Sequence, residues 1–264
     1  MKKYFFSSLI FLASLAFDAF AQQNNTLTAK EREEGWVLLF NGRNFDGLRA
    51  FNGTEMPEIW TIDNGAMRVA ASARLGGRPA PPPRDPNAPR QQRPANEGPR
   101  PSNDIVFGDK KFSNFELSLE WMVAEGANSG IFYYVVEGAG MSIFSAAPEI
   151  QVLDNWNAPD NKGSNRLAGS LYDMIPALPS NAKPAGEWNR IVVRVKDGNV
   201  THTQNGQVVV QYTLWTPEWK ALVANSKFAE WPGFRDGPAK EGFIGLQDHN
   251  DNNVWFRNIK IREL

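Results

Sequence analysis

Two short stretches of the chain each place two polar side chains two residues apart. In residues 148–155 the alternation of a β-strand puts Glu149 and Gln151 on one face, roughly 7 Å apart at a rise of about 3.3 Å per residue. In residues 245–249 the same alternation puts Gln247 and His249 on one face. If the two strands neighbour or face each other, a carboxylate, an imidazole and two amides share one concavity. That composition suits acid-base chemistry on a polyol.

Each pair also has a simpler interpretation. Ile150, Val152 and Leu153 predict a central, buried strand, where a glutamate is rare unless it faces a wet cleft or a partner charge. The alternative is the polar outer face of an antiparallel sandwich. His249 alone is equally typical of a hydrogen-bonded structural histidine, and the mid-strand His202 fits that role better still.

The elements that must position these residues are mostly short strands. The period-two pattern and the Asn-Gly or Asp-Gly turns at 64–65, 197–198 and 205–206 predict hairpins, and residues 127–130 predict a further turn. Only residues 216–226 predict a helix, with Thr216 as N-cap and Pro217 at the first helical position. The chain is therefore expected to be all-β, an antiparallel sandwich or jelly roll with few short helices.

The ends and the charge of the chain limit its location and partners. Residues 1–21 have the basic head, apolar run and small-residue cleavage pattern of a secretory signal peptide, and the chain has no cysteine, so a periplasmic or secreted protein is expected. No apolar run long enough for membrane insertion follows. A net charge of −1 gives no electrostatic footprint for nucleic acid. Oligomeric state is left open.

Residues 22–264 are expected to form one domain. Within it, residues 74–101 are rich in proline and arginine and have almost no apolar side chains, so they are expected to form a flexible insertion. An arginine-mediated contact with an acidic partner is the alternative use of that insertion.

Several motifs occur in the order found in one known family. They include residues 35–42, Phe115-Glu116-Leu117, residues 128–132, residues 149–154, residues 168–172, Gly186-Glu187-Trp188-Asn189, residues 246–249 and residues 256–259. In this ordered set the chain resembles the 3-keto-disaccharide hydrolases, a family also described as 3-keto-glucoside 1,2-lyases and 3-keto-2-hydroxy-glucal hydratases. The resemblance implies a concanavalin-like sandwich, a 3-keto-glycoside substrate and cleavage by removal of the proton on C2. Addition of water across the resulting double bond is the optional second step that the resemblance implies.

The resemblance also implies roles for particular residues. His249, Glu149 and Asp154 are the candidate catalytic residues, because an imidazole suits the C2 base and carboxyl groups suit the remaining proton transfers. A divalent metal ion held by Glu149 and His249 is one way to stabilise the enolate, and amide or indole donors are another. No nucleotide cofactor is expected. The expected substrate contacts are Gln151, Gln247, Asn128, Tyr134, Trp156, Arg166 and Tyr172.

The chain departs from the family pattern at two positions. Met122 and Tyr134 stand where the family often has arginine, so Tyr134 is expected to offer a stacking face or a hydroxyl, and Arg166 is a candidate replacement for one cation. Two other functions remain open. A non-catalytic carbohydrate-binding sandwich would need only exposed aromatic faces, and an interaction domain would use the insertion.

Overall fold

The computed structural model describes residues 23–70, 102–138, 141–145, 147–231, 234, 237–249 and 253–264. The predicted signal peptide (residues 1–21) lies outside these ranges, as does the predicted insertion (residues 74–101). Within them, no helix is long and apolar enough to cross a membrane.

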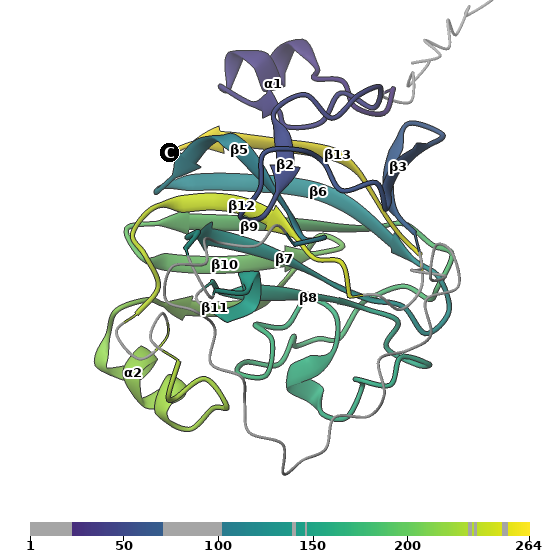
Figure 1. The fold of residues 1–264 in the computed structure, drawn as a ribbon. Helices are drawn as coiled ribbons and strands as arrows, with labels where there is room; N and C mark the ends of the chain where they lie inside the picture. The colour runs from purple at the N-terminus through teal and green to yellow at the C-terminus, as the bar shows by residue number, and fades with distance from the viewer. Residues whose placement is uncertain are drawn as a thin grey trace, which may run out of the picture.

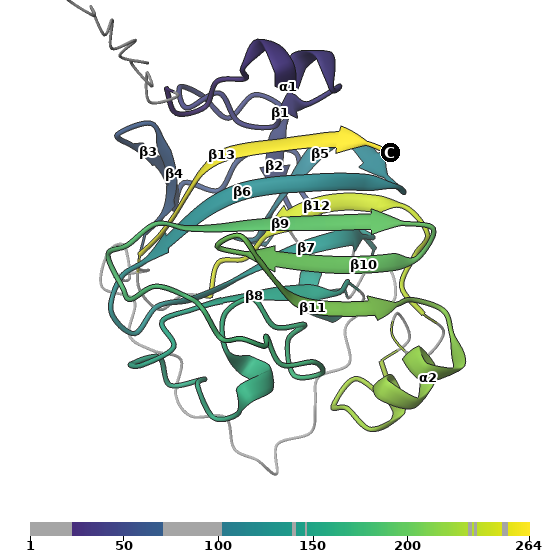
Figure 2. The ribbon, with the colours of Figure 1, turned by 180° about the vertical axis from the view of Figure 1, so that it is seen from behind.

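Two antiparallel sheets make up the fold (Figures 1 and 2). The larger sheet runs in the order β11 (Gln207–Thr213), β10 (Asn199–Gln204), β9 (Asn189–Lys196), β6 (Phe115–Val123), β13 (Val254–Glu263), β4 (Ala66–Val69), β3 (Trp60–Asp63), with β1 (Val37–Leu38) also paired to β13. The smaller sheet runs β2 (Leu48–Ala50), β5 (Ile105–Phe112), β12 (Gly242–Leu246), β7 (Asn128–Val135), β8 (Glu149–Leu153). The predicted antiparallel sandwich is confirmed.

The main hydrophobic core lies between the two sheets. Phe115, Leu117, Leu119 and Trp121 alternate along β6, and each is at most 1% exposed. They meet side chains of the smaller sheet such as Ile131, and burying each one contributes about 1.5–3 kcal/mol. The single-face pattern in the sequence therefore identifies the inner face of the larger sheet.

A second, smaller hydrophobic cluster covers the other face of the smaller sheet. It consists of Phe51, Val106, Phe132, Val135, Ile143 and Ala147. Because side chains alternate along β7, Ile131 belongs to the main core while Phe132 belongs to this outer cluster. The smaller sheet thus has an outer face that is partly packed, and the candidate site lies on that face.

Most of the predicted turns are present. Asn64 and Gly65 have φ values of 50° and 76°, as a type I′ hairpin turn between β3 and β4 requires. The turn predicted at residues 127–130 is wrong, because Asn128, Ser129 and Gly130 already belong to β7. The chain reverses instead around Gly126, whose φ is 72°.

The described helices are short. α2 (Pro217–Ala224) confirms the predicted helix, and the Thr216 hydroxyl accepts a hydrogen bond from the Trp219 amide at its N-terminus. α1 (Ala29–Glu33) begins with a capping box at Thr28. Two 3₁₀ turns follow, η1 (Ile143–Ser145) before β8 and η2 (Ser164–Arg166) after it.

Candidate active site

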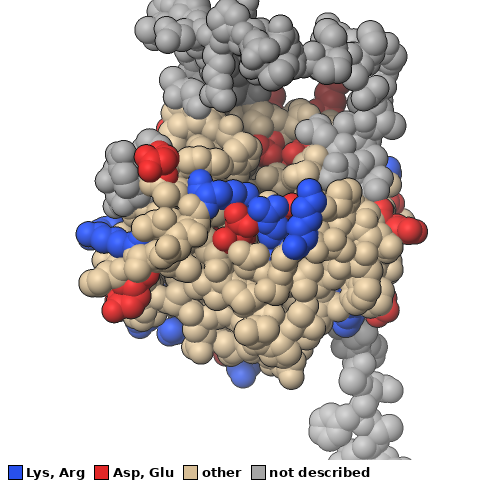
Figure 3. All heavy atoms as spheres, turned by 90° about the horizontal axis from the view of Figure 1, so that it is seen from below, with Lys and Arg blue, Asp and Glu red and all other residues tan. Residues whose placement is uncertain are grey.

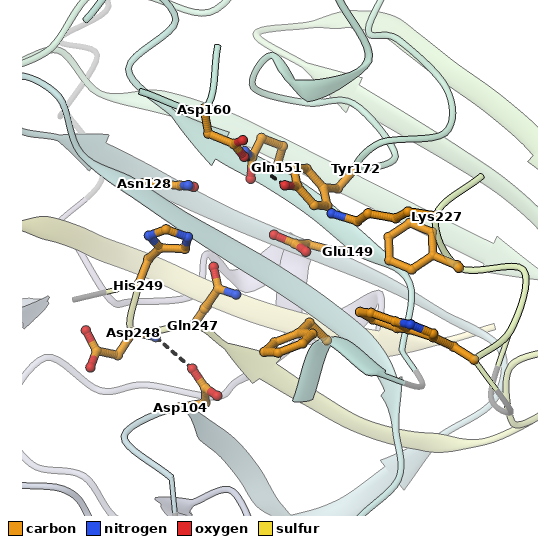
Figure 4. Close-up of a pocket in the computed structure, with 13 residues that line it drawn as sticks. Asp104, Asn128, Glu149, Gln151, Asp160, Tyr172, Lys227, Gln247, Asp248 and His249 are labelled. Carbon is orange, nitrogen blue, oxygen red and sulfur yellow. Dashed lines mark hydrogen bonds between the residues drawn. The ribbon is translucent and has the colours of Figure 1, made fainter. Parts of the chain in front are cut away.

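A pocket of about 390 Å³ lies on the outer face of the smaller sheet (Figure 4). It lies over the first half of β8, next to the end of β12, the start of β5 and the segment after α2. The described residues that line it are Asp104, Asn128, Phe144, Glu149, Gln151, Asp160, Tyr172, Lys227, Phe228, Trp231, Gln247, Asp248 and His249. Both predicted polar pairs, Glu149 with Gln151 and Gln247 with His249, therefore meet in one cavity.

Strand β8 presents the first pair, but it is not a central strand. It is the last strand of the smaller sheet and pairs only with β7 among the described strands. Its free edge is covered by the chain that follows. The Gln151 amide donates to the Ser170 carbonyl at 3.1 Å, and the Tyr172 amide donates to the Glu149 carbonyl at 2.9 Å. The apolar residues Ile150, Val152 and Leu153, which predicted a central strand, therefore belong to an edge strand that is covered by the following chain and not by a second described strand.

Glu149 lies deep in the pocket, with 7% of its surface exposed. Gly130 makes room for it, because a Cβ at that position would lie 2.6 Å from Glu149 Oε1. No side chain in the described part of the chain hydrogen-bonds its carboxyl group. Burial raises the pKa of Glu149 to about 8, with smaller contributions from Asp160 and Asp104, although the positive charge of Lys227 opposes the shift. Glu149 is thus mostly a neutral acid at pH 7.

The amide side chains around Glu149 have unused hydrogen-bonding capacity. Both polar atoms of Gln151 are buried without a partner among the described residues, and so are Asn128 Oδ1 and Gln247 Oε1. Buried amides normally find partners inside the protein, so three partnerless amides lining one pocket point to a ligand rich in hydroxyl groups. All three were predicted as substrate contacts, and the structure brings them together.

The backbone around Gln247 is held in place from two sides. Its amide donates to the Gly130 carbonyl at 3.0 Å, and its carbonyl accepts from the Ser129 hydroxyl at 2.7 Å. β12 ends at Leu246, so Gln247 and His249 follow the strand rather than lie within it. These two hydrogen bonds extend the pairing with β7 beyond the end of β12 and keep Gln247 on the pocket side.

Asp104 is a second carboxyl group in the pocket, which the sequence analysis missed. It is 8% exposed and accepts hydrogen bonds from the Asp248 amide at 3.0 Å and the Ser102 hydroxyl at 2.8 Å. Burial raises its pKa to about 6, although these hydrogen bonds and the nearby His249 oppose the shift. His249 itself is exposed in the pocket lining (Figure 4). Asp104 is therefore mostly ionised at pH 7, in contrast to Glu149.

Lys227 is the cation of the pocket, and it was also missed. Its Nζ lies 4.1 Å from the centre of the Tyr172 ring and 3.8 Å from a carboxylate oxygen of Asp173. Burial lowers its pKa, although the carboxylate of Asp173 opposes the shift. In Figure 4 its amine points toward Glu149 and Tyr172. It supplies a positive charge in a pocket where two expected arginines are missing.

Arg166 supports the pocket from behind. It pairs with Asp160 at 2.8 Å and with Asp173 at 2.7 Å, and Asp160 accepts a hydrogen bond from the Tyr172 hydroxyl at 2.8 Å. Figure 3 views the protein from below, where basic side chains gather around acidic ones. Tyr172 lines the pocket as predicted, but Arg166 does not, and its guanidinium is engaged by Asp160 and Asp173.

Two further predicted substrate contacts, Tyr134 and Trp156, lie away from the pocket lining. Tyr134 has a φ of 58° and is 1% exposed, and its hydroxyl donates to the Ser113 carbonyl at 2.5 Å. The strand irregularity turns it into the main core, so the expected substrate contact does not form. Trp156 is 55% exposed but is not part of the lining.

Asp154 holds a turn together rather than facing the pocket. Its carboxylate accepts from the Gly126 amide at 2.8 Å, the Trp156 amide at 3.1 Å and Asn157 Nδ2 at 3.0 Å. Burial alone would raise its pKa, but these donors lower it overall. The predicted catalytic role of Asp154 is therefore not supported by its placement.

His202 is the other histidine, and it lies in the core. It is fully buried, its Nδ1 is 3.0 Å from the Gly169 carbonyl, and burial lowers its pKa to about 4. The structural interpretation fits this placement.

A metal ion finds no complete set of ligands in the described part of the chain. No three His, Asp or Glu side chains there are grouped closely enough to hold one. Glu149 and His249 both line the pocket, but Asp154 does not join them. The metal stays a prediction.

Comparison with known proteins agrees with the resemblance seen in the sequence. The 3-keto-alpha-glucoside-1,2-lyase-like domain matches residues 35–262. A 3-keto-disaccharide hydrolase from Bacteroides thetaiotaomicron is 40% identical over 92% of this chain and 83% of its own length.

Solved structures agree as well. A crystal structure from Parabacteroides distasonis, assigned as a glycosyl hydrolase, is 28% identical, with a TM-score of 0.75 over 92% of this chain and all of that one. A second structure from the same organism, with the same assignment, is 27% identical, with a TM-score of 0.56 over 87% of this chain and 84% of its own. This chain therefore belongs to the family of 3-keto-alpha-glucoside-1,2-lyase-like domains.

Proposed function

We propose that this protein cleaves the glycosidic bond of 3-keto-glycosides by removing the proton on C2 and eliminating the aglycone. The observation that carries the proposal is the buried, neutral carboxyl group of Glu149 among three amides without partners. The named function of the 40% identical relative supports the same substrate class. A polyol ring would satisfy the amides, and a proton donor would stand ready beside it.

The first step is removal of the C2 proton. A ketone at C3 makes that proton acidic, because the electrons left behind form an enolate, with a C2–C3 double bond and a negative oxygen on C3. We assign His249 as the base, since it lines the same pocket as Glu149 and a neutral imidazole nitrogen can accept a proton.

The second step breaks the bond to the aglycone. The C3 ketone re-forms, a C1–C2 double bond forms, and the C1–O bond breaks. Glu149 donates its proton to the departing oxygen, which suits a carboxyl group with a pKa of about 8. No oxocarbenium ion forms, so the fixed carboxylate separation of ordinary glycosidases is not required.

The negative charge that develops on O3 needs stabilisation. Lys227 carries a positive charge into the pocket, and the amide group of Gln151 offers a donor without a partner. Such groups, fixed before the reaction begins, stabilise a developing oxyanion without reorganising. We assign this role to Lys227 together with Gln151.

Addition of water across the new double bond would convert the elimination into net hydrolysis. Asp104, with a pKa of about 6, is ionised at pH 7 and can take a proton from that water as the water oxygen bonds to C1, while His249 returns to C2 the proton that it removed in the first step. It lines the same pocket and is held by Ser102 and the Asp248 amide. The proposed product is then the free 3-keto sugar.

The direct test is incubation of the purified protein with a 3-keto-disaccharide, with and without a chelator. We expect the free aglycone sugar to appear together with a 2-hydroxy-3-keto-glucal or 3-keto-glucose. Loss of turnover after chelation, restored by a divalent ion, would bring the predicted metal into the mechanism. Binding without cleavage of any 3-keto-glycoside would favour a non-catalytic carbohydrate-binding sandwich.

We further propose that the protein is exported and cleaved after residue 21. The basic head and apolar run at the N-terminus support this. N-terminal sequencing of protein from the periplasmic and culture fractions tests it, with a mature terminus at Gln22 as the expected result. Uncleaved protein confined to the cytoplasm would contradict it.

A further inference from the structure

The pocket has a second wall that the proposed chemistry does not use. Phe144, Phe228 and Trp231 line it together with the polar residues described above. Trp231 contacts both phenylalanine rings, and Phe228 lies beside Lys227, whose Nζ is 5.1 Å from its ring centre. The lining thus combines polar side chains, Glu149 among them, with a cluster of three aromatic rings that begins beside Lys227.

The aromatic wall is a supported structure rather than three isolated rings. Trp231 lies 5.1 Å from Phe228 and 5.8 Å from Phe144 between ring centres. Phe228 stacks in turn on Phe234, with centres 4.4 Å apart and planes inclined by 13°. Phe144 nevertheless keeps 41% of its surface exposed. The wall therefore offers apolar surface in a fixed arrangement.

The rings do not form one flat platform. The planes of Phe228 and Trp231 are inclined by 78°, and those of Phe144 and Trp231 by 46°. A sugar stacks best on a single broad face, whereas inclined rings meet both the face and the edge of another aromatic ring. This geometry favours a flat aromatic ligand.

The low hydrogen-bonding capacity of the three rings also favours an aromatic ligand over a sugar. The indole nitrogen of Trp231 is the only polar side-chain atom that the three rings carry, and Lys227 stands at their border, 5.1 Å from the centre of Phe228. A sugar aglycone would bring several hydroxyl groups against a wall with few partners for them. An aryl group loses no hydrogen bonds there.

From these observations we infer that the aromatic wall is the aglycone subsite and that it selects aryl 3-keto-glucosides. The inference rests on the proposed function, because it assigns the polar part of the pocket to the 3-keto sugar. Phe144 and Trp231 are the specificity-determining residues. Elimination from such a substrate releases a phenol.

The test uses the 3-keto derivatives of phenyl glucoside, methyl glucoside and a disaccharide. Phe144→Leu removes an exposed ring but keeps apolar surface, Trp231→Ala removes the central ring, and Trp231→Phe retains a ring. Phe144→Leu and Trp231→Ala should each lower kcat/KM for the phenyl substrate by about tenfold and for the methyl substrate by no more than about twofold. Trp231→Phe should retain most of the activity. Because each substrate is compared with itself across variants, differences in leaving-group quality cancel.

A second measurement does not depend on turnover. Unoxidised phenyl glucoside and methyl glucoside are titrated into each protein, and the phenyl compound should bind more tightly to wild type but not to Phe144→Leu. Equal losses for all three ketones, or a larger loss for the disaccharide, would overturn the aryl assignment. If wild type cleaves none of the ketones but shows the phenyl preference in binding, the proposed function fails while the aryl subsite stands.

Discussion

At the scale of single residues, the site depends on two carboxyl groups that hold their protons differently. Glu149 has no hydrogen-bond donor among the described residues, so burial dominates and its pKa rises to about 8. Asp104 has two donors and the nearby His249, and its pKa reaches only about 6. At pH 7 the pocket therefore holds one acid and one base, and their environments rather than their residue types separate the two.

Removing either proton-transfer group should slow turnover without unfolding the protein. We expect Glu149→Gln and His249→Ala each to lower kcat by at least about a hundredfold, the usual scale for general acid-base catalysis. The double variant should be little worse than the slower single variant, since the two groups act in one reaction sequence. Steady-state kinetics checks this, with circular dichroism as the folding control. Full additivity of the two losses would contradict the shared role.

The charge of Lys227 should set the alkaline limit of activity. If protonated Glu149 is the acid, kcat/KM should fall as the pH rises through about 8. Lys227 holds that pKa down, so Lys227→Met should move the alkaline limb to higher pH while lowering the maximum rate. Lys220→Met, on the exposed side of α2, is the matched control and should leave the profile unchanged. If the alkaline limb of the kcat/KM profile stays at the same pH in Lys227→Met, a group other than Glu149 causes it.

At the scale of elements, the alternation of side chains between the two faces of a strand predicted the part of the site that lies on or next to regular strands. Glu149 and Gln151 share a face of β8, and Gln247 and His249 continue the direction of β12 into the same pocket. Tyr134 shows where alternation fails. Its positive φ interrupts β7 and turns the ring into the core, and the residue type gives no signal of that.

The residues that were missed all come from segments without a periodic pattern. Asp104 stands just before β5, Lys227 follows α2, and Phe144 lies in a 3₁₀ turn. Their approach to Glu149 depends on long-range packing that no local spacing encodes. The one usable signal was the placement of Asp104 at the start of a strand.

Gly130 in β7 should be essential for the position of Glu149. A Cβ there would lie 3.0 Å or less from three atoms of the Glu149 side chain, so Gly130→Ala should displace the carboxyl group. We expect kcat/KM to fall by about ten- to a hundredfold, because small misplacements of a catalytic group are costly. The melting temperature should change little, since a flexible side chain can move.

Gly108→Ala is the matched control for this experiment. Gly108 is also a strand glycine, and its added Cβ would press on the flexible side chain of Arg49, outside the pocket lining. Its activity should remain near that of wild type. If Gly130→Ala and Gly108→Ala are equally active, Glu149 is not positioned by the space at Gly130.

At the scale of the whole molecule, a large core supports a pocket that costs stability. The two sheets bury most of the apolar side chains between them, while Glu149 and the partnerless amides are buried on the outer face. Burial of a carboxyl group destabilises its ionised form in the native state but not in the unfolded chain, so its pKa is higher in the native state. The free energy of unfolding should therefore change with pH as Glu149 titrates.

The sign of this effect follows from the two pKa values of Glu149. The native value of about 8 lies above the ordinary value of 4.5, so the native state binds more protons between those pH values. This contribution is fully present below pH 4.5 and is lost as the pH rises through about 8. Glu149→Gln lacks this titration, so wild type should lose stability relative to the variant as the pH rises, by on the order of 4 kcal/mol near pH 8.

Thermal unfolding of wild type and Glu149→Gln across pH 4 to 9 measures the difference. Asp104 titrates in both proteins, so the comparison isolates Glu149. A constant difference in melting temperature across this range would mean that Glu149 is ionised at neutral pH and cannot be the proton donor.

The most direct test of the account is exchange of the C2 proton with deuterated solvent, followed by NMR on a 3-keto-glycoside. Exchange needs the base and the enolate stabiliser but not departure of the aglycone. Wild type should therefore catalyse it, Glu149→Gln should retain it while losing aglycone release, and His249→Ala should lose both. If His249→Ala exchanges the C2 proton and releases the aglycone at the wild-type rate, His249 is not the base and the assignment at the centre of this mechanism is wrong.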